Sequence, residues 1–411
     1  MTHDVLTATA ARPARLAAIA LGASIPISTA LDNVLLGIML LAWLLAGAYR
    51  DTLKILLKNK VLQCSSLLLG LLVLGTLYGE STNRDAINAL GKYADLLFIP
   101  LFALIFQDAS IRVKALHVLA ISLAVTVLLS YLTLFGLRPP WPVFTGDATD
   151  PTVFKLRTAH NFLVAFGAFL FAWLAVSAAA RRMQLAWGTL AILAAVNVLF
   201  MVQGATGYVI LGTLMLLFIA QRYGWRGLAL ACAGLAIAFA ALVSIPSKFQ
   251  ARIQSIQQEI TQWRIDEPAT TSSGHRLEFY RNTLDIIAAH PLAGVGTGGF
   301  PQAYAKQVQG TGKLDTRNPH NEFLHLAAQI GILGALALVA LFWVQWRSAR
   351  HLDTPMTRGL AQGLVVTMVI GCMVNSLLFD HTEGLFYAWL TGLLFASYKH
   401  STGNATGVGK Y

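Results

Sequence analysis

A His-Asn pair at residues 320 and 321 is the feature of this sequence best suited to chemistry. It lies in the run Asn318-Pro319-His320-Asn321-Glu322, directly before an apolar segment. Asn318 suits a helix N-cap and Pro319 the first helical position. His320 is therefore expected in the first turn, where free amides and the helix dipole favour an anion and a neutral ring. A neutral histidine can accept a proton at neutral pH. The alternative is a histidine that only caps or anchors the helix.

Two arginines precede this pair on a helix predicted at residues 275–290. Arg276 and Arg281 carry planar guanidinium groups, which match the oxygens of a phosphate. The two arginines are five residues apart, so their side chains project from the helix axis in directions about 140° apart. They converge on one ligand only if the helix lies across the mouth of a pocket. The alternative is that they pair with Glu278 or Asp285.

A second His-Asn pair opens another apolar segment. His160 and Asn161 follow Lys155 and Arg157 closely in the chain. Cationic side chains beside such a pair suit an anionic ligand. We therefore expect His160, Lys155 and Arg157 to contact the same ligand as His320.

The remaining polar residues argue against a metal or nucleotide site. The histidines are scattered without metal-ligand spacing. Asp147 and Asp150 are the only paired carboxylates in a loop, and one such pair is a weak signal for a metal site. We therefore expect neither a metal nor a cofactor. The glycine-rich run 294–299 lacks the Lys-Ser/Thr of a phosphate-binding loop and is better read as a tight turn. Asp380 and His381 occupy a turn that is expected to line the same cavity as the first His-Asn pair.

The amino-acid composition indicates whether these residues belong to a soluble or a membrane protein. The chain has 411 residues, of which 56% are hydrophobic and 12% charged, against about 25% charged in soluble domains. The mean hydropathy is +0.62. Such a chain has too little polar surface to face water, which predicts an all-α polytopic membrane protein. The three cysteines fall in apolar runs and predict no disulfide framework.

A spanning helix needs about 20 apolar residues, and the sequence predicts twelve. They are expected near 14–30, 32–48, 61–79, 91–107, 114–136, 160–180, 184–202, 206–221, 227–246, 321–346, 360–379 and 385–398. The predicted organisation is a first block of nine helices at 1–246, a large loop at 247–320, three helices within 321–400, and a tail at 401–411. Within the loop, residues 248–263 have the apolar spacing of an amphipathic surface helix.

The distribution of Lys and Arg predicts the orientation. If the N-terminus is cytoplasmic, the even-numbered short connections carry the basic residues, while the turns at 30–33, 203–207 and 380–384 carry none. Both termini are then cytoplasmic and the loop at 247–320 lies on the outer face of the membrane. Its many cations are either ordinary solvated charge or part of a pocket for a phosphate or diphosphate.

These motifs resemble those of bacterial O-antigen ligases. His320-Asn321, nine residues and then Gly331-Ile332-Leu333-Gly334 match a His-Asn-x9-Gly-x-x-Gly signature of that family. The segment from Ser273 to Gly296 is similar to the outer loop shared by the ligase and polymerase superfamily. The segment running from Lys92-Tyr93 to Pro100 is similar to one in the ligase branch.

The resemblance implies a glycosyltransferase of the bacterial inner membrane with its active site on the periplasmic face. Its donor is a glycan on undecaprenyl diphosphate and its acceptor is lipid A–core. The other partners are membrane lipids, with no nucleic acid. His320 matches the essential histidine and Arg276 the loop arginine. The expected mechanism is metal-independent, with His320 as general base and Arg276 on the diphosphate, aided by Arg281, Arg157, Lys155, Asn321 and His160.

One departure and three alternatives remain. Family members often carry an arginine in the turn that here reads Gln-Gly-Ala-Thr-Gly at 203–207, so Lys155, Arg157 or Arg281 is expected to fill that role. The related O-antigen polymerase and O-oligosaccharyltransferase share the loop signature. A lipid-linked sugar transporter is the alternative from another class. Transport is disfavoured because no internal repeat is seen and the polar residues cluster on one face.

Overall fold

The computed structural model is built from helices, and it describes residues 2–79, 81–137, 146–202, 204–244, 248–264 and 267–397. No strand occurs in these ranges. The helices are α1 Thr2–Ser24, α2 Thr29–Ala46, α3 Tyr49–Lys58, α4 Lys60–Gly75, α5 Asn83–Lys92, η1 Ala94–Leu97, α6 Phe98–Ile105, α7 Ala109–Leu134, α8 Arg157–Ser177, α9 Arg181–Val196, η2 Asn197–Met201, α10 Ala205–Ser244, α11 Lys248–Gln262, α12 Ser272–Ala289, α13 Phe300–Val308, α14 Glu322–Ala349, α15 Pro355–Val374 and α16 His381–Phe395.

Several of these helices can cross a bilayer. Within the described residues, seven are long and apolar enough to do so, and nine spans result if each of two bent pairs counts as one. A multi-pass membrane protein is thus supported, but the predicted number of twelve spans is not confirmed. The eighth and ninth predicted spans both lie in α10, which is two helical segments joined at a kink, because the backbone of Gly224 is not helical (φ 67°, ψ −161°). The last predicted span is only 15 residues long as α16, or about 22 Å.

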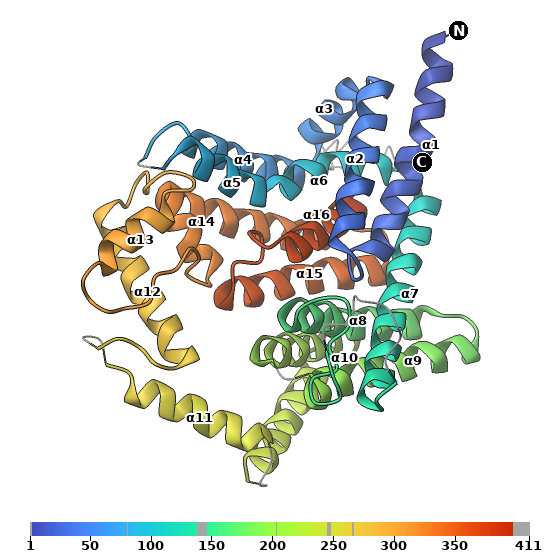
Figure 1. Cartoon of the computed structure of the whole chain (residues 1–411). Coiled ribbons are helices and arrows are strands. Elements are labelled where there is room, and N and C mark those ends of the chain that lie inside the picture. The colour runs from blue at the N-terminus through green and yellow to red at the C-terminus, as the bar shows by residue number, and fades with distance from the viewer. Residues whose placement is uncertain are drawn as a thin grey trace, which may run out of the picture.

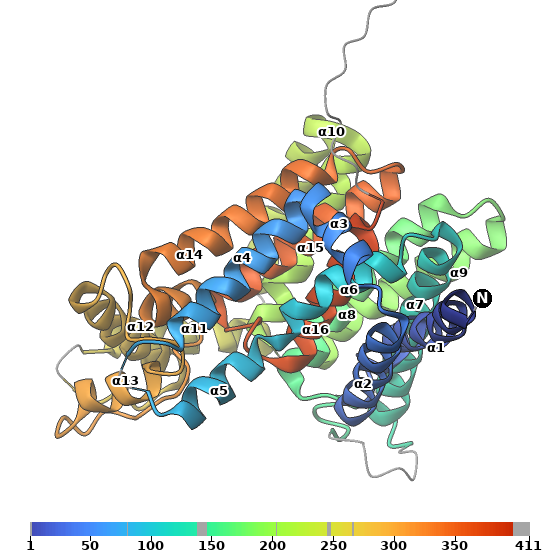
Figure 2. The ribbon, with the colours of Figure 1, turned by 90° about the horizontal axis from the view of Figure 1, so that it is seen from above.

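The centre of the bundle is formed by α8 and α16, whose residues are almost all buried. Edge-to-face contacts of Phe386 with Phe162 and Phe166 join the two helices. By contrast, few residues in the apolar stretches of α9 and α10 are fully buried, which suits contact with lipid. The loop helices α11, α12 and α13 gather at one end of the bundle, away from α1 and α2 (Figures 1 and 2).

The two loop helices expected from the sequence are both present. The helix predicted at residues 248–263 is α11, Lys248–Gln262. The helix predicted at residues 275–290 is α12, Ser272–Ala289. The start of α12 lies earlier because Thr271 is its N-cap and accepts a hydrogen bond from the Gly274 amide at 3.1 Å. The tail at 401–411 lies outside the described residues.

Helix α14 is broken at the first glycine of the Gly-x-x-Gly motif. Gly331 has φ 72° and ψ −177°, which is far from helical values. A Cβ atom there would lie 1.9 Å from the carbonyl oxygen of Leu292, so both the conformation and the close approach require glycine. Gly331 therefore opens α14 to the loop and allows the Leu292 carbonyl to approach its backbone closely.

The glycine-rich run fills this break. The amides of Val295 and Gly296 donate to the carbonyls of Ala328 and Gln329 at 2.9 and 2.8 Å, and the Gly298 amide donates to the Gln329 side chain at 2.9 Å. The run thus satisfies carbonyls that the break releases. Its amides are used by the protein itself, which fits the prediction of a turn rather than a phosphate-binding loop.

We expect Gly331→Ala to lower the thermal stability of the chain. A non-glycine residue at positive φ costs about 1–2 kcal/mol, and here the added methyl group also meets Leu292. Thermal unfolding in detergent measures the loss. The matched control is Gly70→Ala in α4, where an added Cβ meets nothing within 4 Å. Equal melting temperatures for the two variants would contradict the role of the break.

Candidate functional site

His320 lies just before α14 and is held by its backbone. It has a left-handed conformation with φ 57°. Its amide donates to Asn318 Oδ1 at 2.8 Å, and its carbonyl accepts from the Tyr280 hydroxyl at 3.1 Å. The prediction of Asn318 as the N-cap is therefore wrong by three residues. The N-cap of α14 is Asn321, whose side chain accepts from the Leu324 amide at 3.1 Å. Asn318 is instead occupied by His320 and by Ser376, whose hydroxyl donates to it at 2.7 Å.

The imidazole of His320 belongs to a chain of three side chains. Its Nδ1 lies 3.1 Å from Asn375 Oδ1. Asn375 Nδ2 in turn donates to Asp380 Oδ2 at 3.2 Å. Because the amide nitrogen of Asn375 faces the carboxylate, its oxygen is the acceptor for Nδ1–H of His320. This arrangement leaves the Nε2 lone pair of a neutral His320 available to accept a proton.

Asp380 ends this chain in a region of positive charge. Burial raises the pKa of its carboxyl, while Lys92 and His320 oppose that shift. The Lys92 ammonium lies 5.7 Å from the ring centroid of Phe379, next to Asp380 in the chain. The sequence prediction that Asp380 lines the site of the first His-Asn pair agrees with this geometry. His381 instead faces Asp95, at 3.3 Å.

A buried carboxyl group fixes the segment that carries Asn375 and Asp380. Glu322 is fully buried and accepts from the Tyr93 hydroxyl at 2.8 Å and from the Leu378 amide at 2.9 Å. It therefore ties the 375–380 connection to the start of α14. Neither Asn375 nor Glu322 was predicted to have a role. The only sequence signal for Glu322 was its place directly after Asn321.

Arg276 lies on the side of α12 that faces His320. Tyr280, one turn further along α12, donates to the carbonyls of His320 and Met373. Burial raises the pKa of Tyr280, and the nearby Arg276 charge opposes this shift. Arg276 itself is exposed, so its guanidinium is accessible to a ligand beside His320.

Arg281 is directed elsewhere. Its Nε lies 3.5 Å from Asp285 Oδ2, one turn along the same helix. The alternative of pairing with Asp285 is therefore the one the structure shows. The other alternative partner, Glu278, is buried and accepts from the Ala269 amide at 2.9 Å. The two arginines do not converge on one point from α12.

The cations near His160 also have protein partners. Lys155 Nζ lies 3.7 Å from Asp32 Oδ2 and 2.9 Å from Thr29 Oγ1. Arg157 binds Asp150 Oδ2 through Nε at 2.9 Å and Nη2 at 2.5 Å. These contacts lead towards α2 and the 146–156 loop rather than towards His320.

The second His-Asn pair is structural in this arrangement. His160 is buried and its Nε2 lies 3.1 Å from Asn197 Oδ1. Asn161 is buried as well and donates to the Val202 carbonyl at 3.3 Å. A Cβ atom at Gly204 would lie 2.4 Å from Asn161 Nδ2, so the turn that lacks an arginine is packed tightly on this pair. Gln203 lies outside the described residues.

Asn321 has a structural role as well. Besides capping α14, its Nδ2 donates to the Met373 carbonyl at 2.9 Å. It thereby joins α14 to the end of α15, beside His320. Among the described residues, no group of three His, Cys, Asp or Glu side chains could hold a metal ion.

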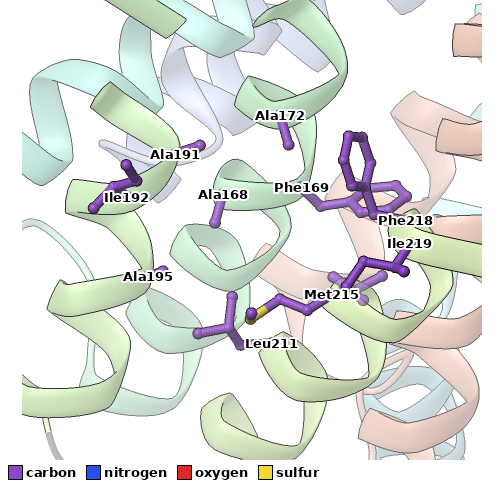
Figure 3. A pocket seen from close by; sticks show the side chains of 11 residues that line it. Ala168, Phe169, Ala172, Ala191, Ile192, Ala195, Leu211, Met215, Phe218 and Ile219 are labelled. Atoms are coloured by element: carbon purple, nitrogen blue, oxygen red, sulfur yellow. The ribbon is translucent and has the colours of Figure 1, made fainter. Parts of the chain in front are cut away.

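Two cavities lie outside this cluster. An apolar cavity of about 220 Å³ lies between α8, α9 and α10. Its lining includes Phe169, Ile192 and Met215 (Figure 3). A second cavity of about 370 Å³ adjoins the glycine-rich run and is lined in part by Tyr78, His290 and Lys306. His320 lines neither, so cavity size does not identify the site. Its identification rests on the hydrogen-bonded chain.

The fold and these contacts define a multi-pass helical membrane protein with a polar cluster at one end of its bundle. Comparison with known families adds the class. Residues 189–339 match the family model described as O-antigen ligase. The match includes α12, the glycine-rich run and His320, and it supports the resemblance of these motifs to the O-antigen ligase superfamily.

Other comparisons say less. No curated protein matches the chain. A solved structure described as "Structural coordination of polymerization and crosslinking by a peptidoglycan synthase complex" is similar, with a TM-score of 0.49 and 16% identity over 83% of this chain and 98% of the other.

Proposed function

We propose that this protein is an O-antigen ligase. In this reaction a completed glycan moves from undecaprenyl diphosphate to a sugar hydroxyl of lipid A–core on the periplasmic face of the inner membrane. The observation that carries the proposal is the set His320–Asn375–Asp380 beside Arg276, at the loop end of a spanning bundle. The O-antigen ligase match over residues 189–339, which include His320 and Arg276, supports it.

The proposed chemistry is a single displacement. Nε2 of His320 takes the proton of the acceptor hydroxyl as its oxygen attacks the anomeric carbon of the donor. The bond from that carbon to the diphosphate oxygen breaks, and its electron pair leaves with the polyprenyl diphosphate. Arg276 stabilises the charge that develops there. The diphosphate already carries the activation, so the proposal requires no metal or nucleotide.

Four of the predicted binding residues need a different interpretation within this proposal. Arg281, Arg157 and Lys155 are paired with carboxylates. His160 and Asn161 support the core. Lys92, exposed and close to Asp380, is the better second cation for the diphosphate.

Purified components give the decisive test. The detergent-solubilised protein, supplied with undecaprenyl-diphosphate-linked glycan and lipid A–core, is expected to form the joined product with and without a chelator. A product that is lost with the chelator contradicts metal independence. Failure to turn over at all, with intact protein, favours the transporter alternative.

The lipopolysaccharide gel pattern of a deletion strain separates the ligase from its nearest relatives. Loss of a ligase leaves core without attached glycan. Loss of a polymerase leaves core bearing single repeat units. Loss of an O-oligosaccharyltransferase would leave lipopolysaccharide unchanged, and a protein would lack its glycan instead.

Asn375 is expected to act as a positioning residue for His320. Asn375→Leu removes the acceptor that selects the Nδ1–H tautomer, so kcat should fall about 10- to 100-fold with little change in KM. Asn375→Asp keeps an acceptor oxygen and should retain more activity. Initial rates across a range of pH measure both variants.

The control for this comparison is Asn33→Leu, an exposed asparagine on α2 whose side chain contacts only its own helix among the contacts seen. An activity of Asn375→Leu equal to that of Asn33→Leu would contradict the positioning role. So would a fall in Asn375→Leu that comes from KM alone.

A further inference from the structure

The short helix α3 has three distinct faces. One face packs on the bundle: Ile55 and Leu56 are partly buried against the core, and Thr52 Oγ1 accepts from Trp43 Nε1 at 2.9 Å. The ring of Tyr49 meets Trp43 edge-on with centroids 4.8 Å apart. These contacts hold α3 against α2 and leave the other two faces exposed.

The second face is apolar; Leu53 and Leu57 are more than half exposed on it, while Tyr49 at its start is partly covered by Trp43. Tyr49, Leu53 and Leu57 follow one another at four-residue spacing, which places them on one stripe. They are 48%, 53% and 65% exposed. In water such a stripe is unfavourable, because large apolar side chains stay in contact with solvent.

The third face is basic and adjoins the apolar stripe. Arg50, Lys54 and Lys58 are also spaced four residues apart, one position after each residue of that stripe. The two stripes therefore run side by side along α3. One carboxylate, Asp51, lies 2.8 Å from Lys54, so the face keeps a net positive charge. A short helix with adjacent apolar and basic stripes is the pattern of a helix lying in a membrane interface.

The direction of α3 agrees with that pattern. It makes an angle of 106° with the following helix, α4. If α4 crosses the bilayer, α3 runs nearly parallel to the membrane plane. This is an observation independent of the distribution of its side chains.

The place of α3 in the bundle identifies the leaflet. The far end of α4 meets the glycine-rich run, where the Gly75 carbonyl accepts from the Thr297 amide at 2.8 Å. The near end is joined to the end of α16, because Asn59 Nδ2 donates to the Phe395 carbonyl at 2.9 Å. Since α16 begins directly after Asp380, α3 lies at the end of the bundle opposite His320. Figure 2 shows α3 and the loop helix α13 at opposite ends of α4.

We propose that α3 is an interfacial helix that inserts Tyr49, Leu53 and Leu57 into the leaflet opposite the candidate site and binds anionic lipid headgroups through Arg50, Lys54 and Lys58. Its ligand class is a bilayer surface with anionic phospholipids. Charge complementarity supports this occupant, because polybasic segments are attracted to anionic leaflets. The proposal does not depend on the enzymatic activity.

Retention of lipid tests the basic stripe. The full chain is extracted from membranes containing phosphatidylglycerol and phosphatidylcholine, and bound lipids are counted by native mass spectrometry. Lys54→Gln/Lys58→Gln is expected to reduce retained phosphatidylglycerol about tenfold and leave phosphatidylcholine unchanged. The matched control, Arg181→Gln/Arg182→Gln, removes the same charge from an exposed site on α9. Equal lipid loss in both variants, or no loss in the first, overturns the proposal.

The depth of α3 tests the apolar stripe. A spin label at Leu57→Cys or at Lys58→Cys is placed in nanodiscs, in a chain whose native cysteines Cys64, Cys232 and Cys372 are alanine. The label at 57 is expected to be accessible to oxygen and protected from an aqueous nickel chelate, with the reverse at 58. Nickel access at both positions overturns the proposal. Protection at both positions, dependent on protein concentration, assigns the face instead to a second copy of the chain.

Discussion

His320→Ala is expected to lower the rate of glycan transfer by about 10²–10⁴, the usual contribution of a general base. The variant should still be expressed and folded, because the backbone contacts of residue 320 do not use the imidazole. The measurement is the initial rate with purified donor and acceptor. A fall in kcat without a comparable rise in KM identifies a group that acts in the transition state.

The control for this variant is His117→Ala. His117 is exposed on α7, and its ring contacts the Val113 carbonyl on its own helix, so activity should be unchanged. Glycan attachment by His320→Ala at the parent rate would remove His320 from the mechanism. The polar chain to Asp380 would then have to be explained as structural support.

The second large effect is expected at Arg276. Arg276→Ala should reduce the rate about 10²–10³-fold if its guanidinium stabilises the leaving diphosphate. Arg276→Lys should restore little of it, because an ammonium cannot make two parallel hydrogen bonds to phosphate oxygens. Initial rates of the parent chain and of both variants, measured with the same diphosphate-linked donor, give the size of each loss.

Arg281→Ala is the matched control, since it lies on the same helix but binds Asp285. Its activity should stay close to that of the parent chain. Full activity of Arg276→Lys would show that charge alone suffices at this position. An equal loss in the Arg281 and Arg276 variants would mean that both contact the donor, contrary to the geometry of α12.

Buried hydrogen bonds hold the proposed site around His320 in a defined arrangement. Glu322, Tyr93 and the Leu378 amide are buried and connect α14 with the 375–380 segment. A buried carboxyl group with satisfied hydrogen bonds gives that connection a defined geometry. Asn375 is thereby placed beside the imidazole, while Arg276 and Lys92 remain exposed to a ligand.

Some properties followed from the sequence alone. The low charge and high apolar content predicted a membrane protein. Apolar runs of about 20 residues predicted that it is helical, because that is the length of a spanning helix. The loop helices at 248–263 and 275–290 were predicted within a few residues. The His-Asn-x9-Gly-x-x-Gly motif indicated the O-antigen ligase superfamily, which the match over residues 189–339 supports.

Other properties were decided only by the tertiary structure. The left-handed backbone at His320, the break at Gly331 and the partners of Arg281 and Lys155 depend on which groups are brought close in space. Asn375 lies 55 positions from His320 in the chain, and helical periodicity carries no information over that separation. Composition and spacing describe one helix at a time. The tautomer of His320 is selected by the packing of three segments against one another.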